Sequence, residues 1–224
     1  TDVSDASGML IFDVKNRCWS KEMCDICGIR PEQLAAVYES YEKVGTVLPE
    51  IAAELGIPES CIVAAGAGDN AAAAVGTGTV GDGKCNISLG TSGTVFISSD
   101  KFGVDKNNAL HSFCHADGHY HLMGCMLSAA SCNKWWMDDI LGTSDYGAEQ
   151  APIGELGENR LFFLPYLMGE RSPPNNPNAR GTSIGMTMDT AGAKMTRPGL
   201  EGVACALRGP LEVQGVRGTR VQST

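Results

Sequence analysis

The chain has 224 residues, of which 43% are hydrophobic and 19% are charged, a composition typical of an ordinary globular protein with one or two domains. Its 17 basic and 26 acidic residues give a net charge of -9, which argues against nucleic acid as a default partner, because phosphate backbones attract clustered Lys and Arg. No apolar run approaches the roughly 18 residues of a membrane helix, and the N-terminus lacks the basic and apolar regions of a secretion signal, so we expect neither membrane association nor export.

The hydrophobic pattern mixes helical and strand periods and predicts both helices and strands. The expected elements, in chain order, are a strand at 9–14, helices near 21–27, 31–41 and 49–55, a buried strand at 60–65, a helix at 70–75, a hairpin that begins with strand 85–89, strands at 111–115 and 119–125, a helix at 128–141, a strand at 161–164 and a Pro-rich loop at 168–180.

One carboxylate, Asp69, stands at the head of the Ala-rich helix and directly after the predicted buried strand. Glycines at 66 and 68 allow a sharp turn there, and Asp69 can cap the helix. A plain helix cap is one interpretation. The other is a functional acid, because α/β folds build sites at the carboxyl ends of strands. The two are compatible, since a helix N-terminus favours the ionised carboxylate.

The turn Gly90-Thr91-Ser92-Gly93 follows the alternating run Cys85–Leu89. Its glycines permit close backbone approach, and its amides and hydroxyls suit phosphate oxygens, although an ordinary hairpin turn explains the same residues. Neither GxGxxG nor GxxxxGKS occurs, so Rossmann and P-loop sites have no support. The glycine-rich run 76–83 is expected to be a flexible connection.

Histidines and cysteines offer a weaker alternative. Four histidines lie between His111 and His121, with Cys114 beside them, and they raise a zinc hypothesis; solvated or edge-strand histidines are the favoured interpretation, and no metal site is predicted. Cys24 and Cys27 form a lone CxxC that is read as buried thiols. The total of nine cysteines, odd and irregularly spaced, favours a reducing compartment, and we expect a cytoplasmic protein.

Three motifs carry a resemblance to a known family: GAGDNAAAAVG at 66–76, SLGTSG at 88–93 and FLPYLMGERSPPNNPNARG at 163–181. They resemble the FGGY family of carbohydrate kinases, most closely those that act on xylulose. The resemblance implies two actin-like or ribonuclease H-like α/β domains with the active site in the cleft between them. It also implies transfer of the γ-phosphate of ATP, with Mg²⁺, to a sugar hydroxyl.

By this resemblance Asp69 is the catalytic base, Asp69 and Asn70 bind the sugar, and Gly90, Thr91, Ser92 and Gly93 bind the phosphates of ATP. General-base assistance is typically worth about 10²- to 10⁴-fold in rate. Glu170 and Arg171 are expected to pair and to shape the cleft wall near the nucleotide, with a plain structural ion pair as the alternative. Of Trp135 and Trp136, one is expected in the core and the other at an interdomain contact.

The resemblance covers roughly residues 1–208, about half of a complete family member. Residues 1–66 then form the C-terminal part of the sugar-binding domain, and 67–224 the N-terminal part of the nucleotide-binding domain. The sequence departs from the family where Ser183 replaces a large apolar residue and where Pro198 and Gly199 replace helix formers, so the helix there is expected to be delayed or weakened. The tail after Arg208 loses the pattern.

The expected reaction is phosphorylation of D-xylulose to D-xylulose 5-phosphate, with weak or no activity from these 224 residues alone, because a cleft enzyme that lacks one wall cannot orient both reactants. Kinases for glycerol, ribulose or gluconate are alternatives, and so is a non-catalytic actin-like module that binds nucleotide or a protein partner. The partners are a small sugar and ATP, and a homodimer stays open.

Overall fold

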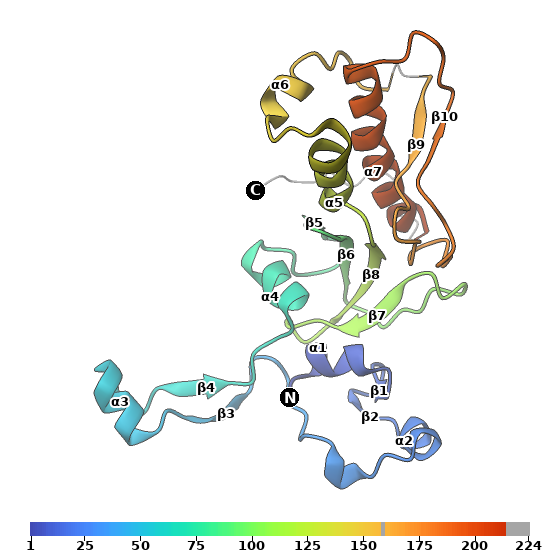
Figure 1. The fold of residues 1–224 in the computed structure, drawn as a ribbon. Coiled ribbons are helices and arrows are strands. Elements are labelled where there is room, and N and C mark those ends of the chain that lie inside the picture. Colours follow the sequence, from blue (N-terminus) through green and yellow to red (C-terminus); the bar gives the residue numbers. More distant parts are fainter. Residues whose placement is uncertain (158–159, 214–224) are drawn as a thin grey trace.

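The computed structural model describes residues 1–157 and 160–213, and its central feature is a four-stranded antiparallel sheet (Figure 1). The strands β5 (Cys85–Leu89), β6 (Gly93–Ser99), β7 (His111–Cys114) and β8 (Tyr120–Met126) lie in the order β5-β6-β8-β7. Gly93 pairs with Met126 and Ser99 with Tyr120, which fixes the register of the two central strands. The predicted hairpin and both following strands are confirmed.

One face of the sheet is covered by the long helix α7 (Ala193–Val213), which packs against β6 and β8. Because side chains alternate along a strand, Val95 and Ile97 point to the same face. They form a core there with Met126, Ala129 and Leu207. Helix α7 runs continuously through Pro198 and Pro210, so the expected delay at Pro198 is wrong. Tertiary packing against the sheet outweighs the local cost of the proline.

The opposite face of the sheet carries stacked aromatic rings. His121 lies between Phe113 and Phe96, with ring centroids 5.0 and 3.9 Å away and interplanar angles of 3° and 21°. His115 meets Phe96 edge-on at 5.0 Å. Such contacts let imidazole rings pack as aromatic core.

The remaining elements after the sheet are short helices and a short hairpin, and they pack against α7. Helix α5 (Ala130–Trp135) continues into the π-helical turn η3 (Trp136–Leu141). The two elements together occupy most of the predicted helix 128–141. They are followed by α6 (Tyr146–Gln150) and by the antiparallel pair β9 (Phe162–Leu164) and β10 (Thr182–Ile184). Among the described residues, no helix is both long and apolar enough to cross a membrane.

The N-terminal region is less regular than predicted. It contains α1 (Val3–Ala6), the 3₁₀ turns η1 (Ser7–Met9) and η2 (Pro31–Gln33), the short strands β1 (Phe12–Asp13) and β2 (Cys18–Trp19), and α2 (Lys21–Cys27). The predicted strand 9–14 is shortened because Leu10 adopts a left-handed backbone. The predicted helix 31–41 stops at Gln33, because Tyr38 pairs in extended conformation with the chain start, where Val3 N–H donates to the Tyr38 carbonyl at 2.9 Å.

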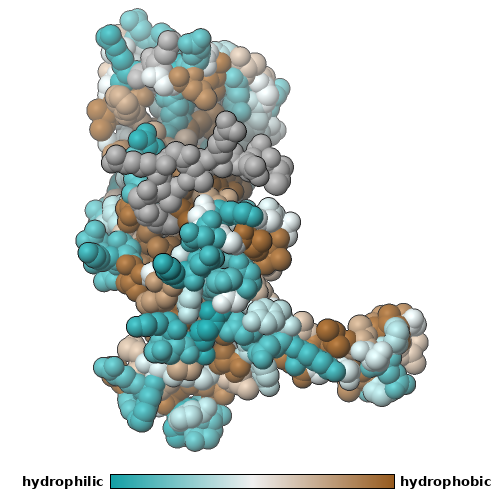
Figure 2. All heavy atoms as spheres, turned by 180° about the vertical axis from the view of Figure 1, so that it is seen from behind, coloured by the Kyte–Doolittle hydropathy of each residue, from teal (hydrophilic) through white to brown (hydrophobic). Residues whose placement is uncertain are grey.

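A projecting arm consists of β3 (Lys43–Thr46), α3 (Pro49–Leu55) and β4 (Ile62–Ala64). The two strands pair only with each other among the described strands, and every residue in them except Gly45 is exposed. The prediction of a buried strand at 60–65 is therefore wrong about burial: Ile62 and Val63 are 59% and 42% exposed. Figure 2 shows hydrophobic side chains gathered on this arm.

Candidate functional site

A hollow of about 100 Å³ lies where the N-terminal segment, the start of helix α4 (Asp69–Gly76) and the aromatic face of the sheet meet. Asp69 is exposed to solvent here, and Asn70 lies beside it. The hollow is open and is lined by Ser4, Asp5, Gly8, Gly68, Asp69, Asn70, Ala71, Phe113, His121 and Met123. The acid predicted from the sequence thus faces a space that a small molecule can enter.

Asp69 is the first residue of α4, and Gly68 is the N-cap, so the predicted capping role of Asp69 is wrong. Its Oδ1 accepts hydrogen bonds from the backbone N–H of Asn70 at 2.7 Å and from Asn70 Nδ2 at 3.1 Å. No described residue bonds to Oδ2, which leaves that oxygen available to a ligand. A first-turn carboxylate is also favoured by the helix dipole.

The position of Asp69 depends on a buried network that the sequence did not reveal. The Gly68 N–H donates to Ser4 Oγ at 2.9 Å. The carboxylate of Asp2 accepts from Ser4 Oγ at 2.6 Å and from Ser40 Oγ at 2.8 Å. The signal that could have pointed to this network is the DxSD pattern at residues 2–5, in which Asp2 caps helix α1.

The turn Gly90-Thr91-Ser92-Gly93 lies at the far end of β6 from the histidines. Met123 of the hollow pairs with Phe96, three residues from Gly93, so the turn begins about 10 Å along the strand from that pair. Gly90, Thr91 and Ser92 are exposed, but Gly93 is buried against Ala129 and Leu207. Three members of the predicted set can meet a ligand, whereas Gly93 faces the core in this chain.

The carbonyl groups of the turn face helix α5. The Gly90 carbonyl accepts from Ala130 N–H at 2.9 Å, and the Thr91 carbonyl accepts from Ala129 N–H at 3.0 Å and from Ser131 Oγ at 2.7 Å. No described residue accepts from the N–H groups of Thr91 and Ser92. Exposed N–H groups beside hydroxyls are suitable ligands for phosphate oxygens.

The histidines form no metal site: no three His, Cys, Asp or Glu side chains within residues 1–157 and 160–213 come together to hold an ion. His115 is fully buried and its Nε2 donates to the Thr79 carbonyl at 2.9 Å, which anchors the connection that was expected to be flexible. Burial lowers the pKa of His121 to about 3, with a further contribution from His115. His121 is therefore neutral near pH 7. Cys24 is buried and Cys27 exposed, and all nine cysteines are free.

Glu170 and Arg171 do not form the predicted ion pair. Glu170 is 3% exposed, and its Oε1 accepts from the backbone N–H groups of Arg171 at 2.7 Å and Leu127 at 3.1 Å. Its Oε2 is buried without a hydrogen-bond partner among the described residues. Burial raises the pKa of this carboxyl, an effect that the two N–H donors and the Arg171 charge oppose.

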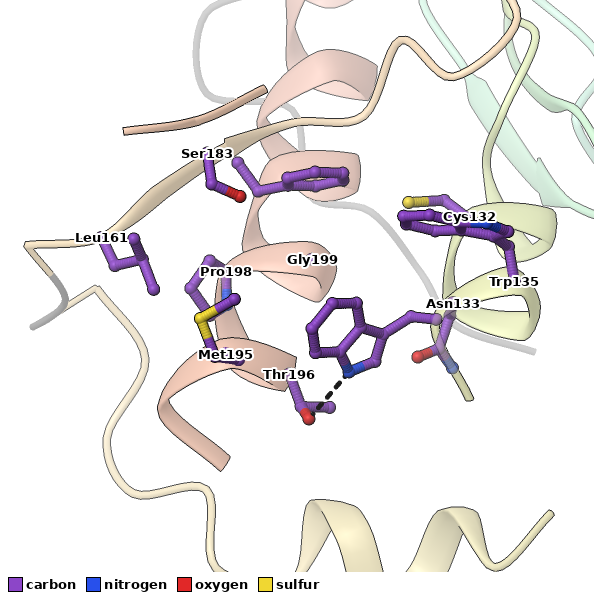
Figure 3. A pocket seen from close by; sticks show the side chains of 11 residues that line it. Cys132, Asn133, Trp135, Leu161, Ser183, Met195, Thr196, Pro198 and Gly199 are labelled. Atoms are coloured by element: carbon purple, nitrogen blue, oxygen red, sulfur yellow. Dashed lines mark hydrogen bonds between the residues drawn. The ribbon is translucent and has the colours of Figure 1, made fainter. Parts of the chain in front are cut away.

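A second cavity, of about 20 Å³, lies between α5, α7 and the β9–β10 hairpin, and it has room for about one water molecule (Figure 3). Both Trp135 and Trp136 line it, and Trp136 Nε1 donates to Thr196 Oγ1 at 3.0 Å. Ser183, Pro198 and Gly199, the positions that depart from the family pattern, also line it. This cavity is a packing feature and is too small for a substrate.

Comparison with known proteins gives matches along both parts of the chain. Residues 1–76 match the N-terminal domain of the FGGY family of carbohydrate kinases, and residues 85–222 match its C-terminal domain. The second match extends beyond Arg208, where the resemblance was expected to end; residues 214–222 of that tail lie outside the described residues.

Individual relatives agree with this match. A xylulose kinase of Escherichia coli K12 is 42% identical over 226 residues, which cover 100% of this chain and 46% of the relative. Two solved structures are similar: a xyloylose kinase from Brucella ovis (TM-score 0.90, 38% identity, 98% of this chain and 46% of that one) and a gluconate kinase from Lactobacillus acidophilus (TM-score 0.84, 27% identity, 96% and 44%). The chain spans less than half the length of each.

Proposed function

This chain belongs to the FGGY family of carbohydrate kinases, and from that premise we propose that the protein containing it transfers the γ-phosphoryl group of ATP to D-xylulose. Its fold is that of the family, an actin-like arrangement of mixed helix and sheet. The product is D-xylulose 5-phosphate. The observation that carries the proposal is the exposed Asp69 carboxylate, which opens into a hollow with one oxygen unengaged.

We assign Asp69 as the general base and, with Asn70, as a sugar ligand. Phosphoryl transfer relies mainly on positioning and charge stabilisation, so the carboxylate orients the attacking hydroxyl and accepts its proton. Asn70 holds Oδ1 through two donors, which keeps Oδ2 for the substrate. The exposed residues Gly90, Thr91 and Ser92 are proposed as phosphate ligands, and Gly93 supports their turn by close packing.

The chain offers groups that suit ATP and Mg²⁺. Mg²⁺ is usually bound by one or two carboxylates together with substrate phosphates, and the carboxylates of Asp5 and Asp69 line the same hollow. The ion supplies charge neutralisation at the transferred phosphoryl group.

We place residues 1–66 in the sugar-binding domain and 67–224 in the nucleotide-binding domain. Free cysteines support a cytoplasmic location, and a homodimer is retained as an assembly to measure.

The test is a coupled kinase assay on the complete gene product with D-xylulose, ribulose, gluconate and glycerol. We expect D-xylulose to give the highest kcat/KM and Asp69→Asn to lower kcat by about 10²- to 10⁴-fold. Asp25→Asn, which changes an exposed carboxylate on α2, is the matched control. A higher kcat/KM for another substrate would show that D-xylulose is not the preferred one. An unchanged kcat in Asp69→Asn would reject the assignment of Asp69 as the general base. ATP binding without measurable phosphorylation of any of the four substrates would favour a non-catalytic module. The 224-residue chain alone is expected to show weak or no turnover.

A further inference from the structure

The conformation of the turn at 90–93 depends on the backbone that precedes and begins helix α5. The N–H groups of Ala129 and Ala130 and the hydroxyl of Ser131 all donate to the carbonyls of Gly90 and Thr91. These three bonds hold the carbonyl side of the turn against α5. A shift of residues 129–131 would therefore move the exposed Thr91 and Ser92.

That segment is held in turn by the loop at 168–181. Leu127, two residues before Ala129, donates its N–H to Glu170 Oε1 at 3.1 Å. On the adjacent strand end, Ser172 N–H donates to the Cys125 carbonyl at 3.2 Å. Glu170 is itself fixed by two backbone bonds with Asn176, at 2.8 and 2.9 Å. The loop thus clamps the junction between β8 and α5 on both sides.

The buried acid at the centre of this clamp costs free energy, because a desolvated carboxylate needs donors for its charge. Its Oε1 has two backbone donors, but Oε2 is buried with none among the described residues. Burial raises the pKa of Glu170, which agrees with a carboxylate whose charge is only partly compensated by hydrogen-bond donors.

We infer that Glu170 is a positioning residue for the nucleotide: through Leu127 and the first turn of α5 it holds the turn at 90–93 in the conformation that receives phosphate. This inference rests on the proposed function, because it takes the turn to be the phosphate site. Glu170 does not touch the substrate in this account. Its effect is transmitted by the backbone bonds at 127–131.

The test compares Glu170→Ala with Glu170→Gln in the complete gene product. Loss of a hydrogen bond to a charged acceptor predicts a rise of about 10-fold or more in KM for ATP and in Kd for ADP measured by calorimetry. KM for the sugar should change by less than about 2-fold, since the hollow around Asp69 is formed by other residues. Glu170→Gln keeps one acceptor oxygen for Leu127 and should recover most of the affinity.

A second variant covers the case in which Glu170→Ala does not fold. Ser131→Ala removes only the hydroxyl bond to Thr91 and should raise KM for ATP by about 3-fold. Ser99→Ala, at the other end of β6, is its control. Equal rises in both KM values without recovery in Glu170→Gln, or unchanged ADP affinity in folded variants, would overturn the inference. ADP binding needs no turnover, so absence of sugar phosphorylation would reject the proposed function while the ADP titrations still decide the role of Glu170.

Discussion

Pro210 of helix α7 lies directly over Gly124 of strand β8: a Cβ built on Gly124 would come within 2.4 Å of the Pro210 Cβ. No real pair of carbon atoms tolerates that distance, so the helix can approach the sheet here only because residue 124 has no side chain. The contact accounts for a proline in the last turn of the helix, since Pro210 is fully buried and its ring packs against the strand.

Replacing Gly124 by alanine should therefore destabilise the protein. Overpacking a closely packed contact costs about 1 to 3 kcal/mol, and Gly124→Ala is expected at the upper end because a strand backbone and a helix must separate. Chemical denaturation measures the free energy of unfolding. Gly199→Ala on the same helix, where an added Cβ meets no atom within 4 Å, should stabilise by up to about 1 kcal/mol. Equal effects of the two changes would contradict this packing account.

The small cavity beside Ser183 predicts a stabilising change. Ser183 lies on β10 opposite Phe163 and lines a space of about 20 Å³. Ser183→Val adds apolar volume and suits a strand, so the free energy of unfolding should rise by about 1 kcal/mol. Ser183→Ala adds no volume and should give a smaller gain. A loss of stability in Ser183→Val would show that the cavity cannot accept a branched side chain.

The sequence predicted the elements whose signals are local. Helix α2 follows a Ser N-cap, α3 begins at Pro49, and both occupy the predicted ranges. Long-range pairing defeated the prediction elsewhere: the segment after Gln33 is extended because it pairs with the chain start, and α7 passes through Pro198 because the sheet and hairpin pack along it. No local pattern in either segment carries that information.

The candidate site shows the same division. Asp69 could be singled out because a carboxylate after a glycine turn at a helix start is a local signal, and the structure places it in an open hollow. Asp5 and His121 come to that hollow from residues far apart in the chain, so spacing alone could not find them. The partner of Glu170 was also missed, because the bond to Leu127 spans 43 residues.

The buried His121 should make stability depend on pH. Its pKa in the folded protein is lowered to about 3, mainly by burial, whereas an unfolded histidine titrates near 6.5. Between these values the unfolded chain binds a proton that the folded protein excludes. The stabilisation that comes from a neutral His121 is fully present above pH 6.5. As the pH falls below that value, the free energy of unfolding decreases by about 1.4 kcal/mol per pH unit, or about 2 kcal/mol at pH 5.

His121→Phe tests this dependence, since it can retain a stacked ring between Phe113 and Phe96 without a titrating group. The free energy of unfolding, measured from pH 7.5 to 5, should fall less steeply in the variant than in the parent. His119→Gln, which changes a half-exposed imidazole, measures the contribution of a solvent-facing histidine. Parallel curves for His121→Phe and the parent would show that the unfolded state does not take up the extra proton.

The two glycines of the turn should respond differently to the same substitution. A Cβ on Gly93 would lie 2.9 Å from both Ala129 Cβ and Leu207 Cδ2, whereas a Cβ on Gly90 meets only the Ser92 carbonyl oxygen at 3.7 Å. Gly93→Ala should therefore lower the free energy of unfolding by about 1 to 3 kcal/mol. Gly90→Ala should change the free energy of unfolding by no more than about 0.5 kcal/mol. It should raise KM for ATP, because the methyl group obstructs close approach of a phosphate to the backbone.

Thermal unfolding and initial-rate kinetics on both variants separate the effects on stability from those on ATP binding. A stable Gly93→Ala protein with weakened ATP binding would instead place Gly93 at the phosphate.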